Sequence, residues 1–228
     1  MTESDQHSRG QSDSVQKNLD SLQTQRDLDW APEHLAEHLA YRQSLQNEAE
    51  WSRVVKAGDV VAPFALDEVD GGTVALADLV HTGPTVLIFF RFENCPACNA
   101  ALPAYRDALA PELDKLGAHL VAISPQITER LVAIKRRLDL PFPVASDPDA
   151  SLIRSLGIAF APTADEQEER ARQGPDISAI LGNGRWDLPY PTVVVIDQDY
   201  VVRFADAHPD WMVRTEVDAV LDAVRSLS

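Results

Sequence analysis

The chain has 228 residues, of which 45% are hydrophobic and 25% charged, and its formal net charge is −16. This composition is typical of a globular protein with one large domain, and the acidic excess excludes attraction to nucleic acid or to anionic membrane surfaces. Apolar runs are far shorter than the roughly twenty residues of a membrane helix, and residues 1–10 lack an export signal, so we expect a cytoplasmic protein.

The first part of the chain predicts an N-terminal extension. Residues 1–18 are rich in Ser, Gln and Asp without a periodic apolar face, which predicts a disordered tail. Residues 19–55 predict a helical extension, whose clearest helix starts near Pro32. We expect this extension to pack on the domain or on a second subunit, so a homodimer is one expected assembly.

The remaining residues, 56–228, predict one α/β domain in which a central sheet is flanked by helices. Residues 157–189 have little periodic order and predict an inserted lid or loop. The expected elements are strands at 64–66, 74–76, 85–90 and 119–123, helices at 96–116 and 128–138, an edge strand at 141–144, a helix at 149–156, strands at 192–196 and 201–205, and a helix opened by a capping box at 215–218.

The sequence contains two cysteines, Cys95 and Cys98. A disulfide between them would close so short a loop that it could not stabilise the fold in the usual way, which favours a redox role. Pro96 is suited to the first position of a helix, so Cys95 is the expected N-cap and Cys98 lies in the first turn. The positive end of a helix stabilises a thiolate and can lower a cysteine pKa from about 8.5 to between roughly 3.5 and 7.5.

Other functional motifs carry less weight. Zinc normally needs four ligands, and neither a second Cys-x-x-Cys nor a histidine pair lies near these cysteines. The His34 to His38 segment matches a metalloprotease motif, but it is a duplicated Glu-His-Leu-Ala in the extension with no third ligand. No glycine-rich phosphate loop is present, so we expect neither a bound cofactor nor a metal.

Four segments, in the same order, resemble the peroxiredoxin-like branch of the AhpC/TSA (redoxin) superfamily. The resemblance covers about residues 56–227 and implies a thioredoxin fold with a mixed sheet. Its segments are Gly58–Phe64, Phe89–Cys98, Val121–Pro125, and Trp186–Asp197 with its continuation to Trp211.

The resemblance places Cys98 where a peroxiredoxin has its attacking cysteine. It places Cys95 at the family's threonine and Arg91 at its proline, and the family's active-site arginine falls on Pro191. Arg91 is then the candidate substitute for that arginine. Alignment with thioredoxin instead makes Cys95 an exposed nucleophile and implies a cis peptide bond between Tyr190 and Pro191.

The sequence thus predicts a thiol oxidoreductase of antioxidant type that works through a Cys95–Cys98 disulfide. Its expected substrates are peroxides or protein disulfides, and its expected reductant is thioredoxin or a similar dithiol. Either cysteine can be the attacking thiol at this stage. The competing hypothesis is a redox sensor or binding module without turnover. Supporting roles are expected for Arg91, Pro96, Tyr190 and Pro191.

Overall fold

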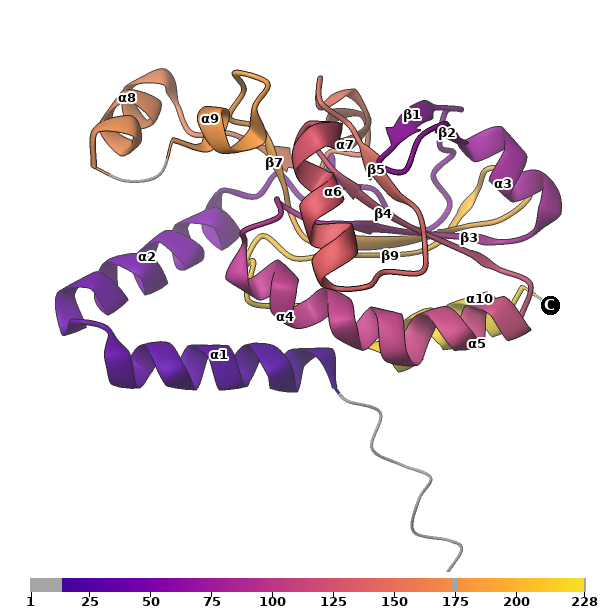
Figure 1. Cartoon of the computed structure of the whole chain (residues 1–228), viewed down its shortest axis with the longest axis horizontal. Coiled ribbons are helices and arrows are strands. Elements are labelled where there is room, and N and C mark those ends of the chain that lie inside the picture. The colour runs from indigo at the N-terminus through magenta and orange to yellow at the C-terminus, as the bar shows by residue number, and fades with distance from the viewer. Residues whose placement is uncertain (1–13, 174–175, 228) are drawn as a thin grey trace, which may run out of the picture.

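The computed structural model describes residues 14–173 and 176–227, and within them a mixed sheet forms the centre of the molecule (Figure 1). Its strands are β1 (Ala65–Glu68), β2 (Thr73–Ala75), β3 (Thr85–Phe89), β4 (His119–Ser124), β5 (Val144–Ser146), β8 (Thr192–Ile196) and β9 (Val202–Ala207). They lie in the order β2-β1-β5-β4-β3-β8-β9. Strands β3, β4 and β5 are parallel, and the others pair antiparallel. The expected mixed sheet is therefore confirmed.

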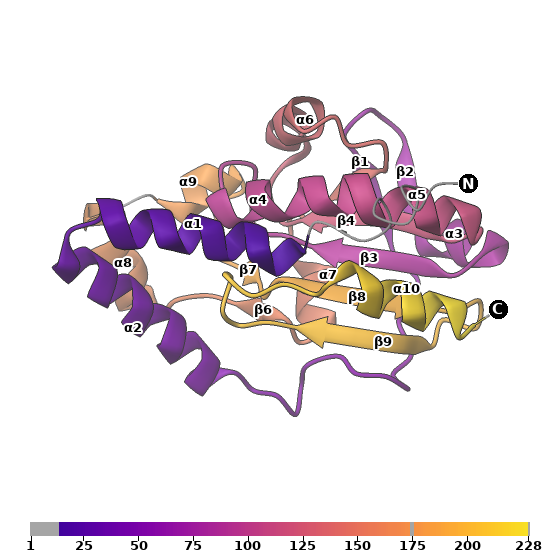
Figure 2. The ribbon, with the colours of Figure 1, turned by 90° about the horizontal axis from the view of Figure 1, so that it is seen from below.

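Helices cover both faces of this sheet. The helices are α1 (Val15–Asp29), α2 (Pro32–Glu48), α3 (Leu76–Thr82), α4 (Pro96–Ala104), α5 (Ala110–Lys115), α6 (Thr128–Arg137), α7 (Ser151–Ser155), α8 (Ala164–Gln173), α9 (Ile177–Leu181) and α10 (Val217–Arg225). A π-helical segment at 105–109 joins α4 to α5, so the predicted helix at 96–116 is continuous (Figure 2). In Figure 2, α4, α5 and α10 lie on the face that also receives α1.

Alternation along the central strands sorts the core between the two faces. Val86 and Ile88 of β3 pack in the cluster that contains both cysteines, with residues of α1, α4, α6 and α10. Leu87 and Phe89 point to the other face, where α3 and α7 pack. The cysteines are thus built into a hydrophobic core and not into a surface loop.

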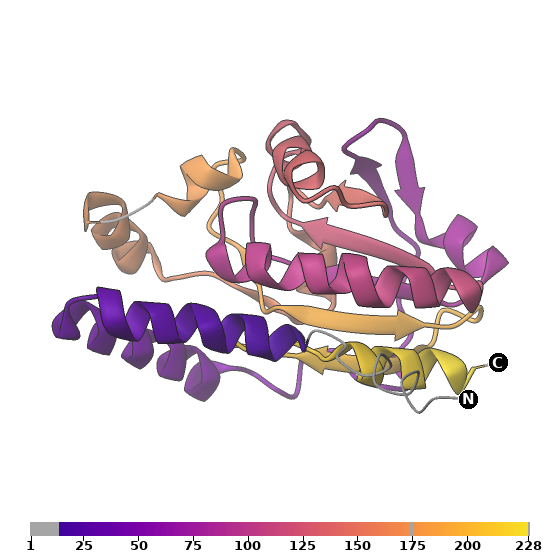
Figure 3. The same ribbon diagram turned by 60° about the horizontal axis from the view of Figure 1, so that its bottom comes forward.

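The extension is a helical hairpin that lies along the domain, with α1 beside α4 (Figure 3). Helix α1 begins at Val15, so the prediction of a disordered tail is wrong for residues 15–18; residues 1–13 lie outside the described residues. The helix starts early because Glu216 accepts hydrogen bonds from the backbone N–H groups of Val15 and Gln16, at 3.0 and 3.1 Å. Such bonds satisfy the otherwise unpaired donors of a first helical turn.

That contact also corrects the predicted capping box at 215–218. Glu216 is the N-cap residue of α10, but its side chain makes no capping bond there. The carboxylate instead caps α1, a helix about two hundred residues earlier in the chain. The predicted helix itself is present, and one face of it is buried through four apolar residues: Val217, Val220, Leu221 and Val224.

Two further predictions need correction or detail. The edge strand expected at 141–144 is the interior strand β5, which lies between β1 and β4 because the β1–β2 hairpin pairs beyond it. Segment 157–189 holds α8, α9 and a two-strand pair, β6 (Ala159–Phe160) with β7 (Leu188–Pro189). Among the described residues, no helix has the length and apolar character needed to cross a membrane.

Candidate active site

The two cysteines lie where β3 passes into α4. The helix begins at Pro96, with Cys95 as its N-cap and Cys98 in the first turn, as predicted. Both cysteines are free thiols, and Pro96 is exposed on the first turn. The preceding loop is fixed by the hydroxyl of Ser124, which donates to the Arg91 carbonyl at 2.9 Å. The sequence therefore places the dithiol at a helix N-terminus held by the neighbouring strand.

Three polar side chains hold this loop from outside. Gln126 accepts from the Glu93 N–H at 2.8 Å and donates to the Ile180 carbonyl of α9 at 2.9 Å. Asn99 donates to the Cys95 carbonyl at 2.9 Å, and Arg137 donates to Asn99 at 2.9 Å. Segment 157–189 thus touches the active-site loop through Gln126 and supports it from behind.

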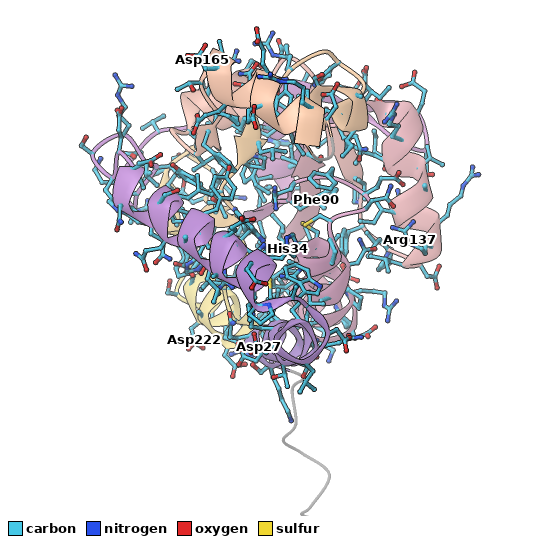
Figure 4. The ribbon with its side chains drawn as sticks, turned by 90° about the vertical axis from the view of Figure 1, so that its left-hand side faces the viewer. Asp27, His34, Phe90, Arg137, Asp165 and Asp222 are labelled. Atoms are coloured by element: carbon cyan, nitrogen blue, oxygen red, sulfur yellow. The ribbon has the colours of Figure 1, made fainter. Side chains whose placement is uncertain are left out.

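Both thiols are buried. Each cysteine is 1% exposed, so the exposed nucleophile implied by the thioredoxin alignment is wrong. Helix α1 packs on α4, and Val15 and Leu19 share the core cluster of the two thiols. A second cover comes from residues 208–216, between β9 and α10, which we call the C-terminal loop. Figure 4 views this side, with Asp27 on α1 and His34 on α2 in front and Phe90 behind them.

The C-terminal loop contributes an arginine that sequence reasoning missed. Nη2 of Arg214 lies 3.7 Å from the Sγ of Cys98, across 116 positions of sequence. Its Nη1 donates to the carbonyls of Trp211 and Val213, which fixes the guanidinium in place. Arg214 thereby brings a positive charge to the thiol that the resemblance left without one. No spacing in the sequence pointed to it, because the contact depends wholly on how the loop folds back.

Arg91 also lies at the site, as predicted. Its guanidinium stacks over the rings of Trp211 and Phe92, at 4.6 and 5.2 Å from their centroids. Its Nε is buried and makes no hydrogen bond to any residue that the structure describes. After the hydrogen bond from Cys98, the charge of Arg91 contributes to the lowered pKa of Cys95, whereas burial raises the pKa of Cys98 and the hydrogen bond to the Arg91 backbone only partly opposes that rise.

The two thiols titrate as one pair. The pKa of Cys95 is lowered to about 5, first because Cys98 donates a hydrogen bond to it, and then by the charges of Arg91 and Arg214, while burial opposes the shift. The pKa of Cys98 is raised by burial and by the hydrogen bond and charge of Cys95, against the charge of Arg214. One proton therefore leaves the pair easily and the second with difficulty, and the remaining proton is shared between the two sulfurs.

Tyr190 and Pro191 do not form the predicted loop. No cis peptide bond occurs among the described residues, so the bond between them is trans, and the implied cis proline is wrong. Tyr190 stacks on Phe160 at 5.2 Å and lines a cavity of about 750 Å³ that does not include the cysteines. The Pro191 carbonyl accepts from the His208 N–H at 2.9 Å, so this residue holds the start of the C-terminal loop.

The histidine motif of the extension is part of an aromatic cluster. His34 and His38 pack against Trp30, with ring centroids 4.6 and 5.0 Å away, and His38 also packs edge-on against Trp211. In the part of the chain that the structure describes, no group of three or more His, Cys, Asp or Glu side chains could hold a metal ion.

A family model described as the AhpC/TSA family matches residues 57–205 of this chain. The chain belongs to the AhpC/TSA family. Cys95, Cys98 and Arg91 lie in the part that the AhpC/TSA model matches, whereas Arg214 and the whole extension lie outside it.

Relatives agree with this family assignment. A Mycobacterium tuberculosis relative of the peroxiredoxins is 33% identical over 101 residues, which are 44% of this chain and 62% of that protein. The 1-Cys peroxiredoxin PER1 of Hordeum vulgare is 27% identical over 177 residues, 75% of this chain and 72% of that protein. Among solved structures, peroxidoxin BcpB from Mycobacterium tuberculosis superposes with a TM-score of 0.60 at 23% identity, over 76% of this chain and 99% of that one. This last match confirms the peroxiredoxin-type thioredoxin fold.

Proposed function

We propose that this chain is a thiol-dependent peroxidase in which Cys98 attacks the peroxide and Cys95 completes the disulfide. The observation that carries the proposal is the approach of Arg214 to Cys98, 3.7 Å from its sulfur, at the N-terminus of α4. The resemblance to peroxiredoxins implies the attacking position for Cys98, and Arg214 would supply the guanidinium for which that resemblance has only Pro191. A fixed positive charge there stabilises both the thiolate and the oxygen that leaves.

The proposed reaction cycle needs only the two cysteines, the peroxide and one external dithiol that donates electrons. When the one proton left on the pair moves from Cys98 to Cys95, Cys98 becomes the thiolate. The Cys98 thiolate then attacks one peroxide oxygen, so an S–O bond forms, the O–O bond breaks, and the departing alkoxide or hydroxide takes a proton from solvent. The Cys95 thiol then attacks the Cys98 sulfenic acid; an S–S bond forms and water leaves with the Cys95 proton. An external dithiol, thioredoxin or a similar protein, restores both thiols by two exchange steps and is itself oxidised.

Burial favours peroxides over protein disulfides as the substrate. A protein disulfide must meet the attacking sulfur directly, and each thiol is only 1% exposed beneath α1 and the C-terminal loop. A small peroxide needs only a narrow opening. We therefore assign disulfide exchange to the step in which the external dithiol reduces the Cys95–Cys98 disulfide. In that step α1 and the C-terminal loop have to move away from the thiols.

The decisive experiment identifies the first oxidised sulfur. In the Cys95→Ser variant, one equivalent of peroxide should give a sulfenic acid on Cys98, trapped with dimedone and located by mass spectrometry. In the Cys98→Ser variant, peroxide should be consumed no faster than by the variant with both cysteines replaced, which is the matched control. Undiminished consumption by Cys98→Ser, with the sulfenic acid on Cys95, would overturn the assignment of the attacking thiol.

The burial also suits a redox sensor without turnover, because a disulfide formed beneath the extension could alter how the extension sits. Turnover separates the two functions. A peroxidase consumes many equivalents of peroxide when a dithiol donor is present, whereas a sensor stops after one. The proposal includes a reducing compartment such as the cytoplasm, where the pair would be kept reduced between turnovers. It also treats residues 56–228 as the redox domain and residues 19–55 as its extension.

A further inference from the structure

The distance from Arg214 to Cys98 is set by the backbone of the C-terminal loop. Nη1 of Arg214 donates to the carbonyls of Trp211 and Val213, which belong to the same loop. These bonds fix the guanidinium relative to the loop, but they do not fix the loop relative to the cysteines. The 3.7 Å between Nη2 and the Cys98 sulfur therefore depends on what holds residues 208–216 in place.

The domain itself holds this loop near its two ends. The Pro191 carbonyl accepts from the His208 N–H at 2.9 Å, and the Tyr105 hydroxyl donates to the Thr215 carbonyl at 2.8 Å. In the part of the chain that the structure describes, the hydrogen bonds that reach residues 209–213 from another segment come from the N-terminal extension. The extension therefore fixes the middle of the loop.

Gln16, in the first turn of α1, holds the loop backbone on both sides of Val213. Its Nε2 donates to the Met212 carbonyl at 3.0 Å, and its Oε1 accepts from the Arg214 N–H at 3.2 Å. Figure 3 shows the start of α1 beside the segment that leads into α10. One neutral side chain thus fixes two successive peptide groups, next to the arginine that approaches Cys98.

A largely buried ion pair ties the same loop to α2. Nε and Nη2 of Arg42 donate to the two carboxylate oxygens of Asp210 at 2.7 and 2.8 Å, and the two side chains are 14% and 12% exposed. Asp210 also accepts from the Met212 N–H at 2.9 Å, so the ion pair is joined to the loop backbone. Both helices of the extension therefore hold the loop, α1 at the Arg214 backbone and α2 through this pair.

We propose that the extension is a positioning element of the active site, in which Gln16 and Arg42 hold the C-terminal loop where Arg214 reaches Cys98. Gln16 and Arg42 act through Arg214 and not by contact with the peroxide. The inference rests on the proposed function in that Arg214 acts on the reacting thiol. The loop and the extension both lie outside residues 57–205, so the reactivity of the matched domain depends on two segments that the AhpC/TSA model does not match.

A neutral substitution tests this proposal without changing a charge. Charged and titratable groups lie close to the thiols and to both positioning residues: Arg91 and Arg214 at the thiols, Asp20 and Glu216 at Gln16, and Arg26 and His38 near Arg42. Gln16→Ala leaves each of these charges in the chain, and alanine is a good helix former. The expected change in the dithiol therefore comes from the position of Arg214 and not from its presence.

The test is a thiol titration without peroxide, read by thiolate ultraviolet absorbance and by the rate of alkylation with iodoacetamide against pH. Gln16→Ala should raise the lower pKa of the dithiol by about half a unit, because it displaces the charge of Arg214 without removing it. Below that pKa, the thiolate fraction should fall roughly threefold. The matched control is Gln43→Ala, at an exposed glutamine of α2 that bonds to Asn47 one turn away, and it should leave the pKa unchanged.

A double variant decides whether Gln16 acts through Arg214. In the Arg214→Gln background, Gln16→Ala should have no further effect on the dithiol pKa, because the charge that Gln16 positions is gone. An equal shift in both backgrounds would overturn the proposal. So would a folded Gln16→Ala protein with the wild-type pKa.

Asp210→Asn separates position from charge at α2. Removal of a negative charge would by itself lower the dithiol pKa, whereas a displaced loop raises it, and we expect the rise. A lowered pKa would overturn the role given to the Arg42–Asp210 pair, and Gln16→Ala still tests the proposal if Asp210→Asn does not fold. Shifts as expected in a protein that never consumes peroxide would overturn the proposed function alone. Peroxide turnover with an unshifted pKa in Gln16→Ala would overturn this inference alone.

Discussion

Replacing Arg214 by a neutral residue should raise the lower pKa of the dithiol, because the charge of Arg214 stabilises its thiolate form. At the 3.7 Å that separates Nη2 from the Cys98 sulfur, two unit charges attract by about 4 kcal/mol at an effective dielectric constant of roughly 20. The guanidinium charge is spread over three nitrogens, of which one faces the sulfur, so we expect about 2 kcal/mol of net stabilisation, in the range of charged hydrogen bonds.

This magnitude converts directly into a titration. About 2 kcal/mol corresponds to roughly 1.5 pKa units, so Arg214→Gln should raise the lower pKa of the dithiol by about that amount and lower the thiolate fraction below it roughly thirtyfold. The second-order rate constant with peroxide should fall at least as far, because in the proposed mechanism the charge of Arg214 also stabilises the departing oxygen. Stopped-flow tryptophan fluorescence can follow the rate, since Trp211 packs on Arg91 beside the thiols.

Two comparisons make the result decisive. Arg214→Lys should lose less of the peroxide rate than Arg214→Gln. Lysine keeps the positive charge but lacks the branched guanidinium group that donates to the carbonyls of Trp211 and Val213. Arg225→Gln, an exposed arginine on α10 paired with Asp222, should behave as the wild type. A folded Arg214→Gln protein with the wild-type dithiol pKa and a rate within about threefold of the wild type would refute the reasoning, since the expected loss is tenfold larger.

Two acidic residues that lie away from the thiols, Glu216 and Asp147, each give a further testable prediction. Glu216→Gln should lower the free energy of unfolding by about 1 kcal/mol, as loss of a helix cap does, and should speed amide exchange in the first turn of α1. The control is Asp222→Asn, at an exposed carboxylate on α10. Unchanged amide exchange in Glu216→Gln, or an equal loss of stability in Asp222→Asn, would contradict the capping role. Burial raises the pKa of Asp147 to about 6, above its unfolded value of 3.8, so its contribution to the free energy of unfolding is present at low pH and is lost as pH rises through about 6. Asp147→Asn should remove that part of the pH dependence in urea unfolding, and parallel wild-type and variant profiles would argue against it.

The sequence predicted well those features that depend on neighbours along the chain. The strand before Cys95, the proline at the first helical position and the apolar face of α10 are local patterns, and the structure has each of them. The parallel pairing of β3 with β4 is the arrangement that two strands joined through a helix usually adopt.

The missed features are all contacts between distant segments. Arg214 reaches Cys98 over 116 positions, and Glu216 reaches Ser14 over 202. Neither contact leaves a periodic or spacing signal, because each depends on where the C-terminal loop lies after the sheet has formed. The resemblance misled at Pro191 for a related reason. It assigned the family's arginine to a position along the chain, whereas the proposed chemistry requires only that a guanidinium lie near the Cys98 sulfur, and a different segment supplies it through Arg214.

The cap that Glu216 places on α1 joins two segments that are about two hundred positions apart, and this has a consequence for biosynthesis. The extension is synthesised before the sheet, whereas the carboxylate that completes its first turn, like the loop it packs on, is synthesised after the sheet. Domains generally acquire structure in the order of synthesis. The nascent sheet and its cysteine helix are therefore expected to fold uncovered, and the dithiol is shielded only after the C-terminal loop has been synthesised.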